Sequence, residues 1–386
     1  MPLRFGTDGI RGVANGDLTP ELALALGRAA VRVLGDGPFV VGRDTRRSGS
    51  MLQAAFSAGA ASEGADVVDL GVLPTPGVAF VGAVRRVPGA VVSASHNPFP
   101  DNGVKLFAAG GRKLSDAEEA DLESELEVVV AGDGGRPTGT GVGALVADPG
   151  ASDGYVDHLV GALEGRSLEG LSVVLDCGHG AAWAVAPEVV RAAGARVAAV
   201  MGAAPDGTNI NAGCGSTDLR PLQAAVAEHG ADVGLAFDGD ADRVLAVDGA
   251  GGVVDGDHIL ALCALDLQRR GRLRGGTVVV TVMTNLGFRR AMEAAGIAVH
   301  ETPVGDRHVL AALDGGGWSL GGEQSGHLVF RDLATTGDGI LTGVQLLDLV
   351  ARRGRPLAEL AGEAMTRLPQ VLHNVRVAQA GGDVGA

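Results

Sequence analysis

The sequence predicts an α/β protein of three consecutive domains, each with a mixed, mostly parallel sheet covered by helices. Short runs rich in Val and Leu alternate with longer Ala-rich segments of helical period, as in parallel strands joined by crossover helices. The 63 glycines are scattered without a collagen period and suit many tight turns between such elements. The chain of 386 residues is also too long for one compact core.

The first α/β block runs to about residue 148. We expect a helix starting at Pro20, because Thr19 before it is a favoured N-cap and proline is tolerated in the first turn. Short apolar runs in this block predict strands at 38–41, 67–70 and 90–93. A helix is predicted over about 50–63. Residues 131–151 are glycine-rich and lack a strong period, so we place a domain boundary there.

Two more blocks follow along the chain. The second begins with a strand over 172–176 and ends with a strand over 233–237, and the third begins near 278–282 and runs to a helix over 339–353. After one strand-like run at 374–377, the chain becomes Gly- and Ala-rich, which we expect to be a stub or a mobile tail. The predicted domain limits are 1–148, 149–247 and 248–366, with 367–386 as the stub of a fourth domain.

Charge and hydropathy exclude several classes of protein. Lys and Arg number 31 against 46 Asp and Glu, a net charge of −15, which argues against a nucleic-acid partner. A small phosphorylated substrate stays possible, because a local Arg or metal site can hold a phosphate on an acidic protein. No apolar run reaches the roughly 18 residues that a membrane helix needs, and the first residues lack the pattern of a signal peptide. We expect a cytoplasmic monomer or homodimer without a membrane partner.

The cysteines indicate neither a metal site nor a disulfide framework. Cys177, Cys214 and Cys263 are odd in number, far apart, and form no C-x-x-C pair. We expect them to be reduced structural thiols.

Three carboxylates form the strongest chemical signal. Asp238, Asp240 and Asp242 follow an apolar strand at alternate positions and are separated by small residues. At the carboxyl end of a parallel strand, such a turn can aim three oxygens at one point, where open α/β sheets place ligands. Converging carboxylates repel one another unless a cation lies between them, and oxygen ligands suit Mg2+. The turn predicts a magnesium site, although a solvated acidic turn would have the same residues.

An EF-hand loop does not fit the same stretch. Counted from Asp238, the sixth position is Arg243 where glycine is required, and the twelfth is Gly249 where a glutamate is required. This calcium-binding alternative is excluded for that reason.

A serine beside a histidine forms the second signal. Ser95 and His96 follow the apolar strand at 90–93 and precede a helix-forbidding Asn-Pro pair. A hydroxyl next to an imidazole suggests an activated nucleophile. The G-x-S-x-G elbow of hydrolases is absent, and on spacing alone a surface turn rich in Asn and Asp is an equal alternative.

One further loop and two arginine-bearing turns complete the candidates. The glycine-flanked loop with Glu323, Ser325 and His327 could hydrogen-bond the hydroxyls of a sugar, or could be a tight polar hairpin. The turns at 5–12 and 42–49 carry arginines that, in isolation, are most often surface ion pairs. The sequence contains neither a P-loop nor a GxGxxG fingerprint between a strand and a helix.

Together and in this order, the motifs resemble the α-D-phosphohexomutase superfamily. Gln324 stands where the phosphomannomutase/phosphoglucomutase branch typically has Met, so the chain is more similar to the phosphoglucosamine mutase branch. The resemblance implies an isomerase that interconverts glucosamine 6-phosphate and glucosamine 1-phosphate for amino-sugar and peptidoglycan precursors. The matching segments, spread from about residue 3 to residue 377, are FGTDGIRG, GRDTRRSG, SASHNPFPDNGVKLF, TNINAGCGSTDLRPL, DGDADR, VGDRHV and GGEQSGH.

The same resemblance implies a role for each motif residue. Ser95 would carry the transferable phosphoryl group as phosphoserine, and its phosphate oxygen would join the three aspartates in binding Mg2+. Glucosamine 1,6-bisphosphate would be the intermediate and activator. The residues implied at the transferring group are Arg11, His96, Lys105 and Arg243, with His327 as proton donor or acceptor. The residues implied to bind the sugar phosphate are Glu323, Ser325, Gly305 and Arg307.

The chain departs from the family pattern at its end. Such mutases close the cleft with a fourth domain whose Arg-Ser-Gly-Thr-type loop holds the phosphate that is not transferred, and no such stretch occurs here. We therefore expect a weak mutase that needs added bisphosphate.

Three alternatives stay open. One is a sugar-phosphate-binding fragment without turnover, and another is a phosphomannomutase/phosphoglucomutase. The third is a phosphatase with Asp238 as an aspartyl nucleophile. It is disfavoured because its D-x-D motif normally opens the chain and is followed by Thr or Val, whereas Asp242 follows here.

Overall fold

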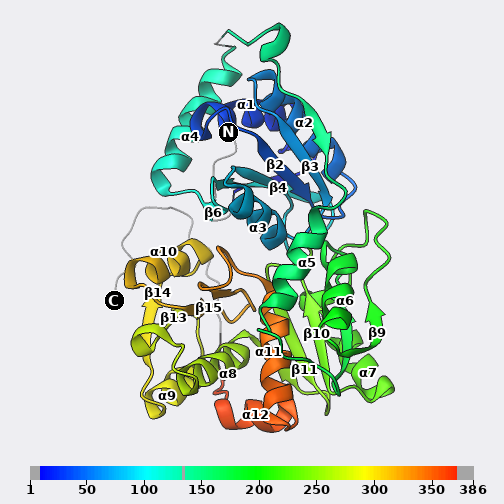
Figure 1. Cartoon of the computed structure of the whole chain (residues 1–386), viewed down its shortest axis with the longest axis vertical. Helices are drawn as coiled ribbons and strands as arrows, with labels where there is room; N and C mark the ends of the chain where they lie inside the picture. The colour runs from blue at the N-terminus through cyan, green and yellow to red at the C-terminus, as the bar shows by residue number, and fades with distance from the viewer. Residues whose placement is uncertain (1–8, 133–134, 372–386) are drawn as a thin grey trace.

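Three β-sheets, each formed by a separate stretch of the chain, divide the molecule into three α/β units (Figure 1). The structure is a computed structural model that describes residues 9–132 and 135–371. Each sheet is parallel along one side and ends in antiparallel pairing on the other. The predicted fold class is confirmed for the described residues.

The first unit has the strand order β1-β5-β4-β2-β3-β7, with β6 paired to β5. Helices α1, α2 and α4 pack on one face of this sheet and α3 on the other (Figure 1). The Thr19 side chain accepts a hydrogen bond from Leu22 N at 3.3 Å, which confirms the predicted N-cap. The strands are β1 (Ile10–Val13), β2 (Phe39–Arg43), β3 (Val67–Val72), β4 (Gly89–Val92), β5 (Asp101–Ala108), β6 (Arg112–Lys113) and β7 (Leu145–Ala147). The helices are α1 (Pro20–Leu34), α2 (Gly49–Ser62), α3 (Thr75–Arg85), α4 (Asp116–Val130) and the 3-10 turn η1 (Gly139–Gly141).

The second unit has the strand order β12-β11-β10-β8-β9. Its central strands β8 and β10 are the two that the sequence predicts, with the same bounds. The strands are β8 (Ser172–Asp176), β9 (Arg196–Met201), β10 (Val233–Phe237), β11 (Val244–Asp248) and β12 (Val253–Val254). The helices are α5 (Ala151–Gly161), α6 (Ala182–Ala192), α7 (Arg220–His229) and the 3-10 turn η2 (Gly215–Thr217).

The third unit has the strand order β14-β13-β15-β16. Helix α11 has the bounds that the sequence predicts, and Asp338 caps it by accepting from Leu341 N at 2.9 Å. The strands are β13 (Thr277–Thr281), β14 (Ala298–Thr302), β15 (Leu320–Gly322) and β16 (Leu328–Phe330). The helices are α8 (Gly256–Arg269), η3 (Arg274–Gly276), α9 (Leu286–Ala294), α10 (Asp306–Gly316), α11 (Gly339–Arg353) and α12 (Leu357–Ala364).

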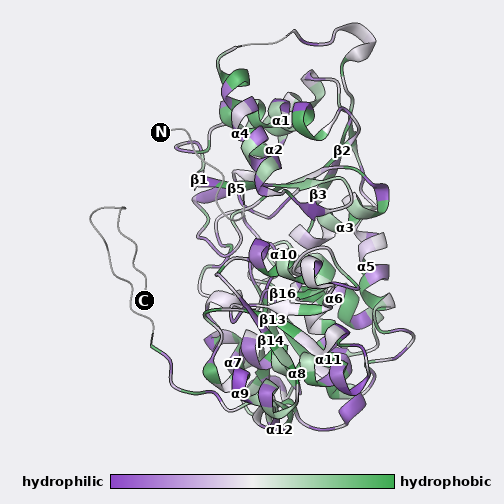
Figure 2. Cartoon of the chain, turned by 90° about the vertical axis from the view of Figure 1, so that its left-hand side faces the viewer, coloured by the Kyte–Doolittle hydropathy of each residue, from purple (hydrophilic) through white to green (hydrophobic). Residues whose placement is uncertain are grey.

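One apolar cluster runs through all three units. It joins Val40 of the first sheet, Val173 of the second and Val278 of the third. Helix α11 is buried along most of its length and packs on β10, β11, β16 and α8 (Figure 2). Because buried apolar surface resists separation, this shared core holds the loops of the three units in fixed relation.

The predicted domain limits stay a proposal. Within them, β12 follows residue 247, where we place the second boundary, yet it pairs with β11 of the second sheet. The expected run at 374–377 and most of the stub at 367–386 lie outside the described residues. Just before them, Leu368 exchanges hydrogen bonds with the Asn285 side chain at 2.8 and 3.0 Å. No helix within residues 9–132 and 135–371 is long and apolar enough to cross a bilayer.

Candidate active site

The three aspartates converge at the carboxyl end of β10. This strand ends at Phe237, runs parallel to β8, and leads into the turn with Asp238, Asp240 and Asp242. One carboxylate oxygen of each aspartate lies within 4.8 Å of the others, and all three side chains are buried. The turn therefore brings three oxygens to one point, as its spacing predicts.

Ser95 reaches this cluster from the first unit. It follows β4, is 1% exposed, and has a left-handed backbone with φ of 51°. Its Oγ donates a hydrogen bond to Asp238 Oδ2 at 2.5 Å. A Cβ at Gly239 would lie 2.5 Å from the Ser95 carbonyl oxygen, so this approach requires glycine. A left-handed non-glycine residue is strained, and such strain concentrates at functional sites.

Arg46 and Asn211 hold the loop that carries Ser95. The buried Arg46 guanidinium donates to Asp44 Oδ2 at 2.8 Å and to four loop carbonyls at 2.6 to 3.1 Å, which belong to Ser95, Asn97, Pro98 and Asp101. Asn211 Nδ2 donates to two of the same carbonyls at 2.9 and 3.1 Å. Two side chains far apart in the sequence therefore fix the backbone of one loop.

Lys105 and Thr75 contact the carboxylates directly. Lys105 Nζ, on the strand beside β4, donates to Asp240 Oδ2 at 2.8 Å and to Asp242 Oδ2 at 3.1 Å. Thr75 Oγ1 donates to Asp240 Oδ2 at 2.6 Å. Lys105 thus lies beside the predicted cation ligands, and its role at the transferring group stays a prediction. No motif in the sequence indicates a role for Thr75.

These residues fit a divalent cation. Asp240 Oδ1 and Asp242 Oδ1 are buried without a hydrogen-bond partner among the described residues, although buried polar atoms are usually satisfied. Burial, and then the charges of Asp242 and Asp240, raise the pKa of Asp238 well above its usual value. Burial acts in the same direction on Asp242, but Lys105 and His327 outweigh it and hold the pKa of that carboxyl well below its usual value. A cation among the oxygens would satisfy the orphaned atoms and relieve the repulsion, and an all-oxygen set suits Mg2+.

The glycine-flanked loop of the third unit reaches the same cluster. His327 is buried, and its Nδ1 lies 3.7 Å from Asp242 Oδ1, beyond hydrogen-bond distance. Burial lowers the pKa of His327, but the Asp242 carboxylate outweighs it, so that the pKa is raised. Gly326 has φ of 91°, and a Cβ there would lie 2.2 Å from Val244 O, so glycine allows this loop to meet the start of β11. Glu323 Oε1 accepts from Gly305 N at 3.1 Å.

Arg243, Arg11 and His96 are the remaining cationic or imidazole candidates. Arg243 N donates to Asp238 Oδ1 at 3.2 Å, and Arg243 Nε lies 3.7 Å from Asp242 Oδ1. Partial burial, and then the charges of Arg243 and Arg11, lower the pKa of His96. Arg11 stands on β1 opposite Gly103. Arg243 thus lies at the aspartate turn, and the charges of Arg243 and Arg11 act on His96, while the chemical roles of all three stay predictions.

Arg307 and Ser325 lie differently from the other predicted residues. Arg307 Nη1 pairs with Glu119 Oε2 at 3.1 Å and with Asp116 Oδ1 at 3.3 Å, both on α4 of the first unit. Ser325 Oγ is buried and has no hydrogen-bond partner in the described part of the chain. Arg307 therefore bridges two units in this structure, and its ion pairs among the described residues are with α4 and not with the aspartates of the β10 turn.

Comparison with known proteins decides the family. Three family models match in order: phosphoglucomutase/phosphomannomutase alpha/beta/alpha domain I at residues 2–131, domain II at 153–251 and domain III at 255–368. The phosphoglucosamine mutase of Symbiobacterium thermophilum is 56% identical over 391 residues, which cover 98% of this chain and 85% of the relative. That of Saccharopolyspora erythraea is 56% identical and covers 100% of this chain and 87% of the relative. This chain belongs to the phosphoglucosamine mutase family.

Solved structures agree with membership in this family of phosphohexomutases. A phosphoglucomutase/phosphomannomutase family protein from Burkholderia thailandensis has a TM-score of 0.79 at 30% identity, covering 95% of this chain and 80% of that one. The N-acetylphosphoglucosamine mutase of Aspergillus fumigatus, solved with GlcNAc-6P and magnesium, has a TM-score of 0.69 at 19% identity, covering 98% of this chain and 83% of that one. The second likeness shows the shared fold.

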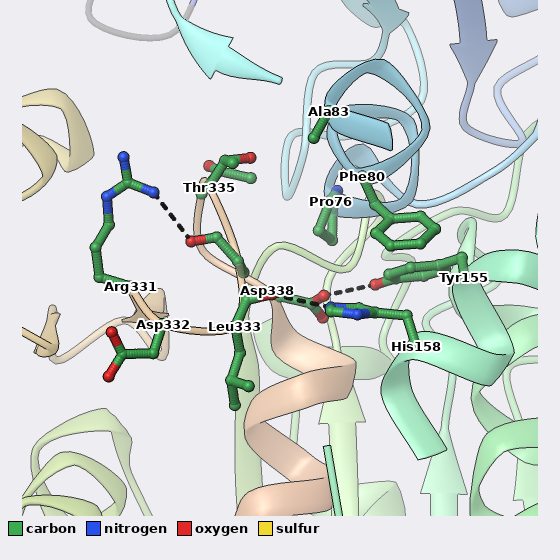
Figure 3. Close-up of a pocket in the computed structure, with 12 residues that line it drawn as sticks. Pro76, Phe80, Ala83, Tyr155, His158, Arg331, Asp332, Leu333, Thr335 and Asp338 are labelled. Atoms are coloured by element: carbon green, nitrogen blue, oxygen red, sulfur yellow. Dashed lines mark hydrogen bonds between the residues drawn. The ribbon is translucent and has the colours of Figure 1, made fainter. Parts of the chain in front are cut away.

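A separate cavity of about 210 Å³ lies where α3, α5 and the loop before α11 meet (Figure 3). The Phe80 ring stacks on His158 at 4.6 Å, and Tyr155 donates to Asp338 Oδ2 at 2.7 Å. None of the phosphohexomutase motif residues predicted above lines this cavity.

Proposed function

We propose that this chain interconverts glucosamine 6-phosphate and glucosamine 1-phosphate, with Ser95 as the phosphoryl carrier. The observation that carries this proposal is the contact of the buried Ser95 Oγ with Asp238 at 2.5 Å, inside a cluster of three carboxylates. The backbone of Ser95 is strained, and a hydroxyl held among acidic groups at such a position suits reversible phosphorylation beside a cation. The relatives above are named for this activity.

The proposed reaction consists of two phosphoryl transfers. In the first, the bond between phosphorus and Ser95 Oγ breaks, a bond forms to the free sugar hydroxyl, and the hydroxyl proton passes to a base while Ser95 Oγ gains a proton. The glucosamine 1,6-bisphosphate then turns over in the site. Its other phosphoryl returns to Ser95 Oγ by the reverse steps, so no phosphate is consumed. Such transfers depend mainly on positioning and on neutralising charge.

Asp238, Asp240 and Asp242, with an oxygen of the Ser95 phosphate, would hold Mg2+. When bound, this ion withdraws charge from the transferring phosphoryl group. Lys105, between Asp240 and Asp242, adds a positive charge on the same side. The further groups assigned to charge stabilisation at the phosphoryl group are Arg243, Arg11 and His96.

The third unit would bind and orient the sugar. The Glu323 carboxylate would accept hydrogen bonds from sugar hydroxyls, and the Ser325 hydroxyl would donate or accept them. Gly305 N donates to the Glu323 carboxylate and holds it in place. His327 Nε2 has no hydrogen-bond partner among the described residues and is the candidate for moving the hydroxyl proton. Arg307 would bind a phosphate of the substrate after leaving its partners on α4.

Glucosamine is the proposed hexose because of the Gln324 loop and the names of the relatives. A polar site discriminates when a missing amine or hydroxyl leaves its own groups unpaired. Glucose and mannose phosphates are the second candidates, since the matching family models cover phosphoglucomutases and phosphomannomutases. The ratio of kcat/KM for the three sugar 6-phosphates decides between them.

The test is turnover by the Ser95→Ala variant with Mg2+ and added bisphosphate. We expect activity to fall by several orders of magnitude with unchanged folding. Ser57→Ala is the matched control, because Ser57 is a buried serine on α2 outside the cluster. Turnover of Ser95→Ala equal to that of the Ser57→Ala control would overturn the proposal.

A further inference from the structure

We propose that Thr75 is a positioning residue that orients Asp240 for the divalent cation. This inference rests on the proposed cation site and assigns a residue that lies outside its ligands. Thr75 is 2% exposed and belongs to the first unit, whereas Asp240 belongs to the second.

Thr75 contacts Asp240 at two points. Its Oγ1 donates to Asp240 Oδ2 at 2.6 Å, and its backbone N donates to Asp240 O at 3.0 Å. One hydrogen bond fixes the carboxylate and the other fixes the backbone that carries it. A ligand held at both ends keeps its direction without help from the ion.

The remaining contacts of Asp240 leave one oxygen for an ion. Oδ2 accepts from both Thr75 Oγ1 and Lys105 Nζ, so its lone pairs are engaged. Oδ1 is buried and accepts no hydrogen bond in the described residues. The hydroxyl of Thr75 thus fixes the carboxylate through Oδ2 and leaves Oδ1 as the oxygen available to an ion.

A purely helical role does not explain this hydroxyl. Helix α3 begins at Thr75, its N-cap residue is Pro74, and no side chain caps it. The Thr75 hydroxyl is therefore not engaged in capping, which is the usual structural use of threonine at a helix start. Its recorded hydrogen bond goes to the second unit.

The contact between Thr75 and Asp240 also connects the unit that carries the phosphoryl group with the unit that carries the cation ligands. Ser95 and Thr75 both belong to the first unit, and Asp238 and Asp240 share one turn of the second. The first unit therefore meets the turn at Asp238 through the carrier serine and at Asp240 through the threonine. Cation affinity should then depend on a residue that touches no ion.

The experiment measures Mg2+ and Mn2+ affinity of the full chain by titration calorimetry. Thr75→Val removes the hydroxyl at nearly equal volume, and Thr75→Ser keeps it. Loss of a group that orients a metal ligand typically costs about 10–100-fold in affinity. We expect Thr75→Val to bind at least about tenfold more weakly, Thr75→Ser to bind within a few-fold of the parent, and KM for the sugar phosphate at saturating Mg2+ to stay unchanged.

Thr342→Val is the matched control. Thr342 is fully buried on α11, and its hydroxyl has no hydrogen-bond partner among the described residues. Its removal should leave cation affinity unchanged. If Thr75→Val does not fold, Thr75→Ala removes the same hydroxyl without a branched side chain and is measured in its place.

Three results would overturn the inference. Equal affinity of Thr75→Val and the parent would show that the hydroxyl does not orient the ligand, and so would a Thr75→Ser variant as weak as Thr75→Val. If the parent itself binds neither ion, the proposed cation site fails and this inference fails with it. The parent titration therefore separates the two cases.

Discussion

Arg46 supports the Ser95 loop mainly through backbone carbonyls. It is 2% exposed, and its five donors match Asp44 and the four carbonyls around it. Lysine has one ammonium group and cannot span that set. We expect Arg46→Lys to lower the free energy of unfolding by about 1–3 kcal/mol for each buried carbonyl that it leaves without a donor, and to lower kcat at least tenfold.

The neighbouring Arg47→Lys is the control for this prediction, since Arg47 is exposed. Urea denaturation and steady-state turnover give the two readouts. A fully active and stable Arg46→Lys variant would show that the loop holds Ser95 without the guanidinium.

Asp257 is a buried carboxyl whose ionisation opposes folding. Burial, with the neighbouring Asp255 charge, raises its pKa from 3.8 to about 6, although Asn285 N donates to it and His258 and Arg367 act against the shift. The folded state therefore binds the proton more tightly, and stability falls as the pH rises from about 4 to 6. Asp257→Asn should raise the free energy of unfolding by roughly 2–3 kcal/mol at pH 8, since one pKa unit is 1.36 kcal/mol.

That gain should shrink as the pH falls from 6 toward 4, because Asp257 becomes protonated in the folded state first and only partly protonated in the unfolded state. Asp255→Asn is the control, and it should lower the free energy of unfolding at pH 8 where Asp257→Asn raises it. Burial raises the pKa of Asp255, but hydrogen bonds from His258 outweigh it and lower that pKa. Urea midpoints of both variants at pH 8 and 4.5 test the sign, and a gain for Asp257→Asn that does not change with pH would contradict the account.

At the scale of elements, α4 and α10 join the first and third units by ion pairs. Arg307 at the start of α10 pairs with Glu119 on α4, and Lys113 before α4 pairs with Asp306. If Arg307 binds the substrate phosphate, Glu119 competes for it. A partly exposed pair is worth about 0.2–1 kcal/mol, so we expect Glu119→Gln to lower KM by up to about fivefold with kcat unchanged.

Glu125→Gln is the matched control for that prediction. Glu125 also lies on α4, but it pairs with Arg32 inside the first unit at 2.7 Å. Its change should leave KM as in the parent. A raised KM in Glu119→Gln would indicate that the pair is needed to form the site and does not compete with substrate.

Elements defined by local pattern could be predicted from the sequence. Strands β8 and β10 and helix α11 have the predicted bounds, because each combines an apolar run with turn residues at its ends. Strand β12 was harder, since two residues give no period, and its pairing with β11 depends on the hairpin between them.

In the candidate site too, only the residues that lie close together in the sequence could be predicted to lie together in space. Asp238, Asp240 and Asp242 share one turn, so their spacing alone predicts convergence. Thr75 could not be found this way, because it meets Asp240 across 165 residues of sequence. Arg46 lies in one of the motifs, but its role depends on carbonyls of a loop that is 49 to 55 residues further along the chain.

At the scale of the molecule, the site exists because three units share one core. Ser95 and Lys105 come from the first unit, the aspartates from the second and His327 from the third. The apolar cluster around α11 connects the same units below the site. Each unit thus contributes a distinct part of the proposed chemistry: the carrier, the cation ligands and the sugar loop.

The whole proposed reaction depends on Ser95 as the carrier of the phosphoryl group. The most direct measurement is peptide mapping by mass spectrometry after the purified chain is incubated with glucosamine 1,6-bisphosphate and Mg2+. We expect one phosphate, on Ser95, that disappears when glucosamine 6-phosphate is added in excess. Phosphate on Ser93, an acid-labile phosphate on Asp238, or no phosphate on any residue of the chain would contradict it.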